Sequence, residues 1–189
     1  MRAFIALSLP DELRLHAVQI AEAVTADTGA RLVPAVNLHV TVQFLGDLSQ
    51  QIVEQVAAAL IEGGGGPVVR VRTGQVVARP SWQRARLVAL ELHDLDGALS
   101  SLARRVEDLT GAMIGGAVSN RPLWPHITLA RFIRPERVRR SPTSQSERVF
   151  DITRLALYHS HIAPGHTPRY DELLGITLGT HAQRSPSNG

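Results

Sequence analysis

The chain has 189 residues, of which 44% are hydrophobic and 20% are charged, and its formal net charge is +3. This length supports a sizeable core, and the composition is ordinary for a globular protein. The absence of cysteine excludes disulfides, thiolate nucleophiles and cysteine-type zinc sites. No apolar run reaches the roughly 18–20 residues that a membrane helix needs, so we expect a cytoplasmic protein.

Strands and helices alternate in the first part of the chain. Residues 4–9 form an apolar run of strand length, and residues 11–28 repeat apolar positions at helical spacing. A short strand at 31–33 and a longer one at 38–45 follow. Ser49 is placed to cap a second helix, which the glycines at 63–66 end. Residues 68–77 and 86–92 indicate two strands around a loop, and residues 96–110 a third helix.

The second part of the chain repeats the pattern of a strand after a helix. Residues 126–132 form an apolar strand behind a stiff, proline-containing lead-in, and residues 134–148 indicate a polar, basic loop. Strands at 150–159 and 169–178 complete the chain before a polar tail, 180–189, that we expect to be disordered. This order predicts an α+β fold. We interpret residues 1–179 as one domain of two similar lobes.

One four-residue pattern occurs twice, at residues 39–42 (HVTV) and 126–129 (HITL). Because side chains alternate along a strand, the His and Thr of each copy share one face, about 6.5–7 Å apart. The apolar residues between them face the core. A pseudo-twofold axis between the lobes would then bring the two His-Thr pairs face to face across a cleft.

The two copies predict acid–base chemistry on a phosphodiester. One imidazole can donate a proton while the other accepts one, and two Thr hydroxyls suit the nonbridging oxygens of the phosphate. For each His alone, a buried, hydrogen-bonded imidazole is the alternative, but two such copies on strands arise by chance in fewer than about one in a hundred chains. No carboxylate cluster accompanies them, and two His leave a divalent ion underligated, so we expect no metal and no cofactor.

Four further residues are candidates for substrate binding. Strict alternation places Arg131 on the face opposite His126, unless a bulge or the strand's end brings its side chain round to the phosphate. Its guanidinium suits this role because it can hold two oxygens at once. Phe44 faces the core by the same parity, with base stacking as the alternative. Trp82 and Trp124 lie in predicted loops and are candidates for stacking on a base, although each can instead cover the edge of the core.

Several stretches in order along the chain resemble one known family. They are residues 2–7 before Leu9-Pro10, 37–46 (NLHVTVQFLG), 120–122 leading into 125–131 (PHITLAR), Leu157-Tyr158 and Arg169-Tyr170. With them the chain resembles the 2H phosphoesterase superfamily. It is most similar to the bacterial RNA 2′,3′-cyclic phosphodiesterases, also called the LigT-like or 2′-5′ RNA ligase family.

The resemblance implies a bilobal α+β fold around a central cleft and metal-independent hydrolysis of RNA 2′,3′-cyclic phosphate ends to 2′-phosphates. It implies His39 as proton donor and His126 as proton acceptor, with Thr41 and Thr128 holding phosphate oxygens and Arg131 contacting the substrate. Where the family has a small apolar residue, this chain has Gln43, which we expect to line the pocket.

The expected partners are RNA ends, tRNA fragments and cyclic nucleotides, bound by a monomer. Two other functions stay open at this point. One is a 2H enzyme for another cyclic phosphate or a 2′-5′ linkage, including RNA ligation. The other is a module that binds nucleotides or RNA ends without turning them over.

Overall fold

The computed structural model describes residues 1–115, 123–139, 147–162 and 167–179, so the predicted tail at 180–189 lies outside the described residues. Over these ranges the sheet has nine strands: β1 (Arg2–Ser8), β2 (Arg31–Leu32), β3 (His39–Asp47), β4 (Val69–Arg79), β5 (Ala85–Asp94), β6 (His126–Glu136), β7 (Val149–Ile152), β8 (Arg154–His161) and β9 (Arg169–Thr177). The helices described are α1 (Asp11–Thr25), η1 (Ala35–Asn37), a single 3-10 turn, α2 (Gln50–Gly63) and α3 (Ala98–Thr110).

The three α-helices form where apolar residues recur at helical spacing, as predicted. The inward stripe of α1 is buried at Leu13, Ala17, Ile20 and Val24. The Ser49 hydroxyl caps α2 by accepting a hydrogen bond from the Ile52 amide at 3.3 Å. Helix α3 begins two residues later than predicted because Gly97 has a left-handed backbone, with φ at 76°. The Asp94 carboxylate instead accepts hydrogen bonds from the first turn of α3.

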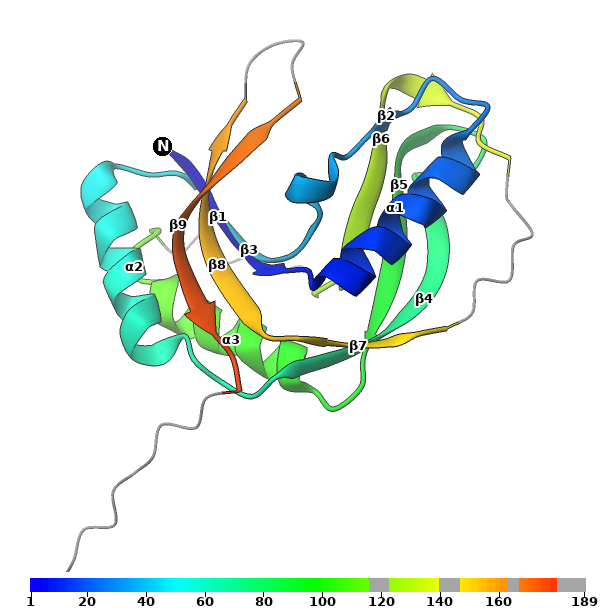
Figure 1. The fold of residues 1–189 in the computed structure, drawn as a ribbon. Coiled ribbons are helices and arrows are strands. Elements are labelled where there is room, and N and C mark those ends of the chain that lie inside the picture. The colour runs from blue at the N-terminus through cyan, green and yellow to red at the C-terminus, as the bar shows by residue number, and fades with distance from the viewer. Residues whose placement is uncertain (116–122, 140–146, 163–166, 180–189) are drawn as a thin grey trace, which may run out of the picture.

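The sheet consists of two halves that meet at one seam. Its strand order is β7-β4-β5-β6-β3-β1-β8-β9, with β2 beside β6, and the pairings are antiparallel. At the seam, β3 and β6 pair at Val40 and Ile127. Figure 1 shows the sheet curled, with α1 against the β4–β6 half and α2 and α3 on the side of β1, β8 and β9. The predicted α+β fold with two lobes is thus confirmed, and the lobes are halves of one continuous sheet.

The strand predicted at 150–159 is two strands that break at Thr153. β7 pairs with β4, at one edge of the sheet, whereas β8 pairs with β1 and β9, near the other edge. Because the sheet is curled, consecutive residues can reach both places, and β7 and β8 run across both halves in Figure 1. This segment ties the two halves together on the side away from the open top of that view.

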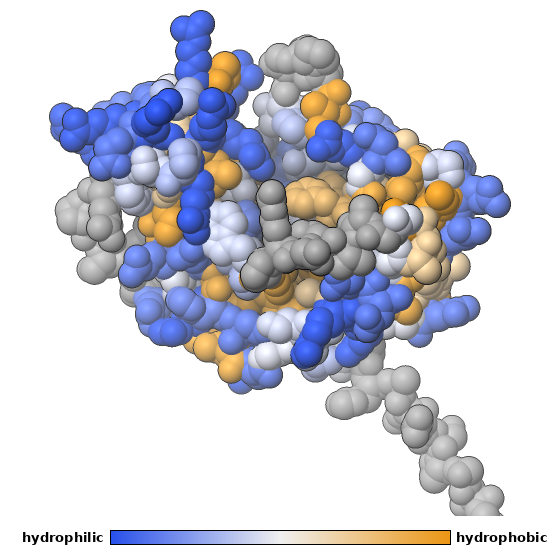
Figure 2. All heavy atoms as spheres, turned by 180° about the vertical axis from the view of Figure 1, so that it is seen from behind, coloured by the Kyte–Doolittle hydropathy of each residue, from blue (hydrophilic) through white to orange (hydrophobic). Residues whose placement is uncertain are grey.

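The core is one cluster of buried apolar side chains that draws on both halves of the sheet. Among its fully buried members are Val40, Leu90, Ile127 and Leu157. Figure 2 shows the back of the molecule, where hydrophilic side chains predominate and hydrophobic ones form several smaller groups. Among the described residues, no helix is both long enough and apolar enough to cross a membrane.

Candidate active site

The two His-x-Thr motifs lie side by side at the seam of the sheet. Val40 and Ile127 are register partners and point into the core, with 0% of each exposed. In this antiparallel register, one residue further along on each side, His39 lies opposite Thr128 and Thr41 lies opposite His126. All four side chains therefore share the face opposite the core. The motifs meet on neighbouring strands of one sheet, not across a cleft from each other as expected.

Both imidazoles are held in the same way by the backbone. The Nδ1 atom of His39 lies 2.7 Å from the carbonyl oxygen of Asn37, and Nδ1 of His126 lies 2.7 Å from the carbonyl oxygen of Trp124. A carbonyl oxygen only accepts, so each Nδ1–H donates and each Nε2 is left for a ligand. In its neutral form each ring presents a lone pair at Nε2, and in its charged form a proton.

The threonine hydroxyls of both motifs are available for a ligand. Thr41 and Thr128 are half-buried, and within the described part of the chain neither hydroxyl makes a hydrogen bond. A hydroxyl without a partner is free to donate its proton to a bound oxygen atom. The pair therefore suits an anion with two oxygens, held beside the two Nε2 atoms.

A β-bulge at the last residue of each motif reverses the alternation of side chains beyond it. On β3, Thr41 pairs with Ala6 and Gln43 with Ile5, so Val42 is the extra residue. On β6, Thr128 pairs with Ala89 and Ala130 with Val88, so Leu129 is the extra residue. Each bulge sits at the fourth position of its motif. The two motifs are therefore equivalent in backbone as well as in sequence.

The bulges place Phe44 and Arg131 on the face of the histidines. The prediction that Phe44 faces the core is wrong: 69% of Phe44 is exposed, because the extra residue at Val42 shifts it to the other face. Arg131 reaches this face through the bulge at Leu129, as the sequence allowed. Gln43 was expected to line the pocket, but it points the other way and accepts a hydrogen bond from the Thr110 hydroxyl on α3 at 2.8 Å.

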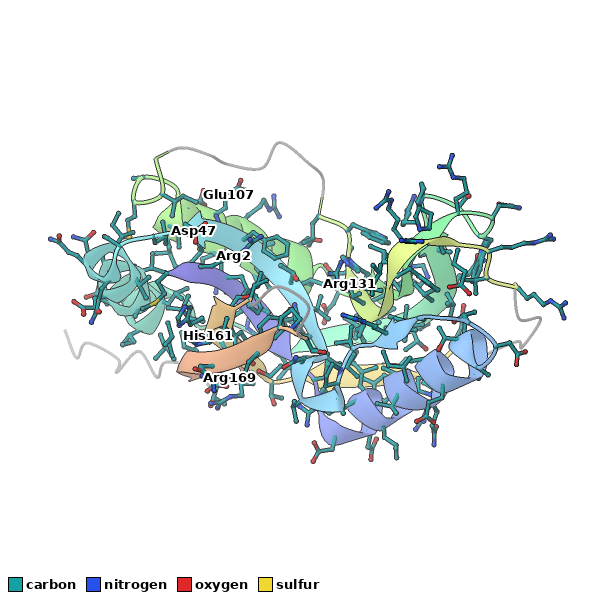
Figure 3. All side chains as sticks on the ribbon, turned by 90° about the horizontal axis from the view of Figure 1, so that it is seen from above. Arg2, Asp47, Glu107, Arg131, His161 and Arg169 are labelled. Atoms are coloured by element: carbon teal, nitrogen blue, oxygen red, sulfur yellow. The ribbon has the colours of Figure 1, made fainter. Side chains whose placement is uncertain are left out.

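A cavity of about 380 Å³ opens on this face. His39, Thr128, Phe44 and Arg131 line it. The next cross-strand pair along the seam, Thr41 and His126, shares this face but is not part of the cavity lining. In Figure 3, which looks onto the molecule from above, Arg131 lies on β6 of one half and Arg2 on β1 of the other. Sequence reasoning missed several lining residues: Arg2, Phe4, Asn37, Ser160 and Tyr170. The alternation of Arg2 and Phe4 along β1 is the signal that could have found two of them.

His39 lies in an aromatic environment. Its ring centroid is 5.0 Å from that of Phe4 and 5.4 Å from that of Tyr170, the latter edge-on at 84°. Burial lowers the pKa of His39, the Asn37 hydrogen bond raises it, and the positive charges at His126 and Arg131 lower it further. The free ring is therefore biased toward its neutral form.

His126 has a different environment, made by Trp124, Arg79 and Glu91. The Trp124 ring stacks on His126 with centroids 3.8 Å apart, and its Nε1–H donates to Glu91 Oε1 at 2.9 Å. The Arg79 guanidinium lies 4.8 Å from the centre of the Trp124 ring. Burial lowers the pKa of His126, and Arg131 and Arg79 lower it too, whereas the Trp124 carbonyl and Glu91 raise it.

The two tryptophans differ in their relation to the cavity. Trp124 was a candidate for stacking on a base, with covering the core edge as the alternative, but its ring contacts His126 and Arg79 and does not line the cavity. Trp82 lies apart from the histidines and packs against the core, beside a separate hollow formed with Arg137 and Arg139. The structure thus gives Trp124 a place beside the imidazole and does not bring Trp82 to the site.

Comparison with known proteins identifies a matching family and a similar protein of known activity. Residues 7–87 match the model of the LigT-like phosphoesterase family. The chain is 32% identical over 176 residues to an RNA 2′,3′-cyclic phosphodiesterase of Escherichia coli K12, covering 91% of this chain and 93% of that protein.

Solved structures show the same fold. Escherichia coli LigT complexed with 3′-AMP is 28% identical with a TM-score of 0.78, covering 95% of this chain and 98% of that one. The protein TT0787 of Thermus thermophilus is 24% identical, also with a TM-score of 0.78, and covers 96% of this chain and 100% of its own. Other crystals of Escherichia coli LigT contain NADP⁺ and ATP.

Proposed function

The chain belongs to the LigT-like phosphoesterase family, and from this membership we propose that it hydrolyses the 2′,3′-cyclic phosphate at RNA ends to a 2′-phosphomonoester. One observation carries the proposal. The two His-x-Thr motifs flank a single residue pair at the seam, so both imidazoles and both hydroxyls converge on one face. The similarity to the Escherichia coli RNA 2′,3′-cyclic phosphodiesterase supports the same substrate class.

The proposed reaction is an in-line displacement at phosphorus. The oxygen of water attacks, and its proton passes to Nε2 of His126. The bond between phosphorus and the 3′ oxygen breaks, and Nε2–H of His39 protonates that oxygen. The products are a 2′-phosphate and a free 3′ hydroxyl. Each proton transfer contributes about 10²–10⁴-fold to the rate.

The remaining residues stabilise the charge that develops on the phosphate. Thr41 and Thr128 donate their free hydroxyls to the two nonbridging oxygens, and the Arg131 guanidinium offsets the added negative charge. The substrate anion also stabilises the charged form of His39, which burial otherwise disfavours. Phe44, exposed at the rim of the cavity, is placed to stack on the terminal base.

The chemistry of the donor set supports catalysis without a metal. Nδ1 of each imidazole already donates to a carbonyl oxygen. In the proposed reaction, one Nε2 atom acts as the acid and the other as the base. The reverse reaction, which forms a 2′-5′ bond, is open to the same residues. The expected monomeric state and cytoplasmic location stay predictions from the sequence.

A product assay tests the proposed function. The protein is incubated with adenosine 2′,3′-cyclic monophosphate and with RNA that ends in a cyclic phosphate, each with and without EDTA, and ³¹P NMR identifies the product. We expect only the 2′-phosphate, unaffected by EDTA. His39→Ala and His126→Ala should each lower turnover by at least about 100-fold, while His93→Ala, an exposed residue outside the site, should not.

Three outcomes would contradict the proposal: a 3′-phosphate product, inhibition by EDTA that added metal reverses, or full activity in either variant. Saturable binding of the cyclic phosphate without any product would instead identify a binding module.

A further inference from the structure

The cavity extends along β1 well beyond the catalytic residues. His39 is the register partner of Ser8, at one end of β1, and Phe44 is the partner of Phe4. Arg2, at the other end of the strand, still lines the same cavity. Ser8 and Arg2 are six positions apart on β1, but the sheet curls (Figure 1), and the Tyr170 ring from β9 lies only 5.4 Å from the His39 ring. The cavity therefore offers more than a place for the scissile phosphate.

Three polar side chains line the cavity beyond the catalytic residues and have no hydrogen-bond or ion-pair partner among the described residues: Arg2, Ser160 and Tyr170. Register places Arg2 on β1 beside Ser160 on β8, one step on from the pair Ala3–His159, and Ser160 pairs with Tyr170 on β9. Ser160 lines the cavity although only 9% of the residue is exposed. Throughout the described ranges, neither hydroxyl has a hydrogen-bond partner and the Arg2 guanidinium has no ion pair. Asp47 is the register partner of Arg2 on its other side, without an ion pair between them.

The row of residues is suited to an anion. A guanidinium can only donate hydrogen bonds, and two hydroxyls beside it can orient their protons in the same direction. Arg2 and Arg131 both act to lower the pKa of Tyr170, against the effect of its burial, which places the phenol within the field of both cations.

The walls between the two ends are apolar. Phe44 and Ile162 line the cavity with 69% and 55% of their surfaces exposed, so apolar surface is available there to a ligand. A volume of about 380 Å³ is at the lower end of the range for small-molecule sites. A single nucleoside between two phosphates matches this arrangement.

We propose that Arg2, Ser160 and Tyr170 form a second phosphate subsite, which binds the phosphate on the 5′ oxygen of the terminal nucleoside. The inference rests on the proposed function and specifies its substrate class. A 5′ phosphate that bridges to the preceding nucleotide of an RNA and a terminal 5′ monophosphate share this chemistry. The enzyme then prefers either of them to a cyclic mononucleotide that lacks a 5′ phosphate.

The test compares kcat/KM for three substrates: adenosine 2′,3′-cyclic monophosphate, the same compound with a 5′ phosphate, and the dinucleotide ApA with a terminal cyclic phosphate. We expect the two substrates with a 5′ phosphate to exceed the first by about tenfold, the effect of one charge-assisted contact. Arg2→Gln should bring the ratio of kcat/KM with and without the 5′ phosphate to about one, and Ser160→Ala should reduce it about threefold. Arg84→Gln removes an exposed arginine outside the cavity and should leave the ratio unchanged.

The outcomes separate the two proposals. If no cyclic phosphate is hydrolysed, the proposed function fails. If the first compound is hydrolysed but the wild-type ratio is near one, or Arg2→Gln leaves the ratio unchanged in a protein of unaltered thermal stability, the second subsite is overturned and the function stands. A preference for the dinucleotide alone would also overturn it, because an upstream nucleoside would then carry the selectivity. Rescue of the ratio by Arg2→Lys would support a charge contact.

Discussion

At the scale of single residues, the two histidines have the same backbone contact and different neighbours. Each donates Nδ1–H to the carbonyl two residues earlier, which is how a local sequence repeat produces the same imidazole orientation twice. Around that common contact, His39 meets Phe4 and Tyr170. His126 meets Trp124, whose indole N–H is held by Glu91. These different neighbours allow the two rings to take different roles.

Glu91 and Arg79 should move the pKa of His126 in opposite directions. Glu91 raises that pKa and Arg79 lowers it, so Glu91→Gln should lower it and Arg79→Gln should raise it. In the Glu91→Gln variant the side-chain amide oxygen can still accept from the indole N–H, which separates charge from geometry. NMR titration of the His126 ring protons, assigned with His126→Ala, measures both shifts.

The acid limb of the kcat/KM profile should follow the pKa of His126, because only its neutral form accepts a proton from water. Arg131 and His39, the other charged or titratable groups near this ring, are unchanged in both variants. Arg84→Gln is the matched control and should move neither quantity. Shifts of the same sign in the two variants would show that the tryptophan contact, and not the charges, sets the pKa.

At the scale of elements, the two bulges decide which side chains reach the substrate. Without the extra residues at Val42 and Leu129, Phe44 and Arg131 would point into the core, as strict alternation predicts. The bulges exchange the faces, so that an aromatic ring follows one motif and a guanidinium follows the other. The site is therefore nearly twofold in backbone and asymmetric in chemistry.

Because the bulge on β3 places Phe44 on the cavity face and Gln43 on the opposite face, substitutions at these two residues should have different effects. Phe44→Ala should raise KM about tenfold, through loss of base stacking, with little change in stability because the ring is exposed. Gln43→Ala should leave kcat/KM nearly unchanged and lower the free energy of unfolding by at most about 1 kcal/mol, because it removes one acceptor of the Thr110 hydroxyl, which keeps the Val106 carbonyl at 2.9 Å. Denaturant titration and steady-state kinetics measure both. A rise in KM in Gln43→Ala, together with a loss of stability in Phe44→Ala, would mean that β3 lacks the bulge.

These elements also show what the sequence could predict. The His-x-Thr repeats and the helical stripes are local patterns, and the structure places them as periodicity predicts. A bulge has no such pattern, since one extra residue is visible only against the partner strand. For the same reason, the break at Thr153 between β7 and β8 was missed, and Ser160 and Tyr170 became part of the cavity only through strand pairing.

At the scale of the whole molecule, segments that cross between the halves join them into one body. Helix α1 follows β1 in the chain but packs on β6 of the other half, and α3 contacts both β3 and β4. β7 and β8 are consecutive and pair near opposite ends of the sheet. The active site forms at the seam, so its geometry depends on these crossings.

We therefore expect residues 1–179 to unfold as one cooperative domain. Trp82 and Trp124 lie beside the β4–β6 half, whereas Tyr170 and helix α2 belong to the other. Tryptophan fluorescence and far-ultraviolet circular dichroism should give the same midpoint in denaturant, as two-state unfolding requires. Two separated transitions would show that the halves are independent domains.

The central claim is that His39 and His126 hold one phosphate between them. The most direct measurement is an NMR titration of both imidazoles with and without adenosine 2′-monophosphate, the proposed product. The phosphate dianion should raise the pKa of both rings together, from values that burial holds below the ordinary one. A response confined to one ring, with the other titrating as in the free protein, would contradict the claim.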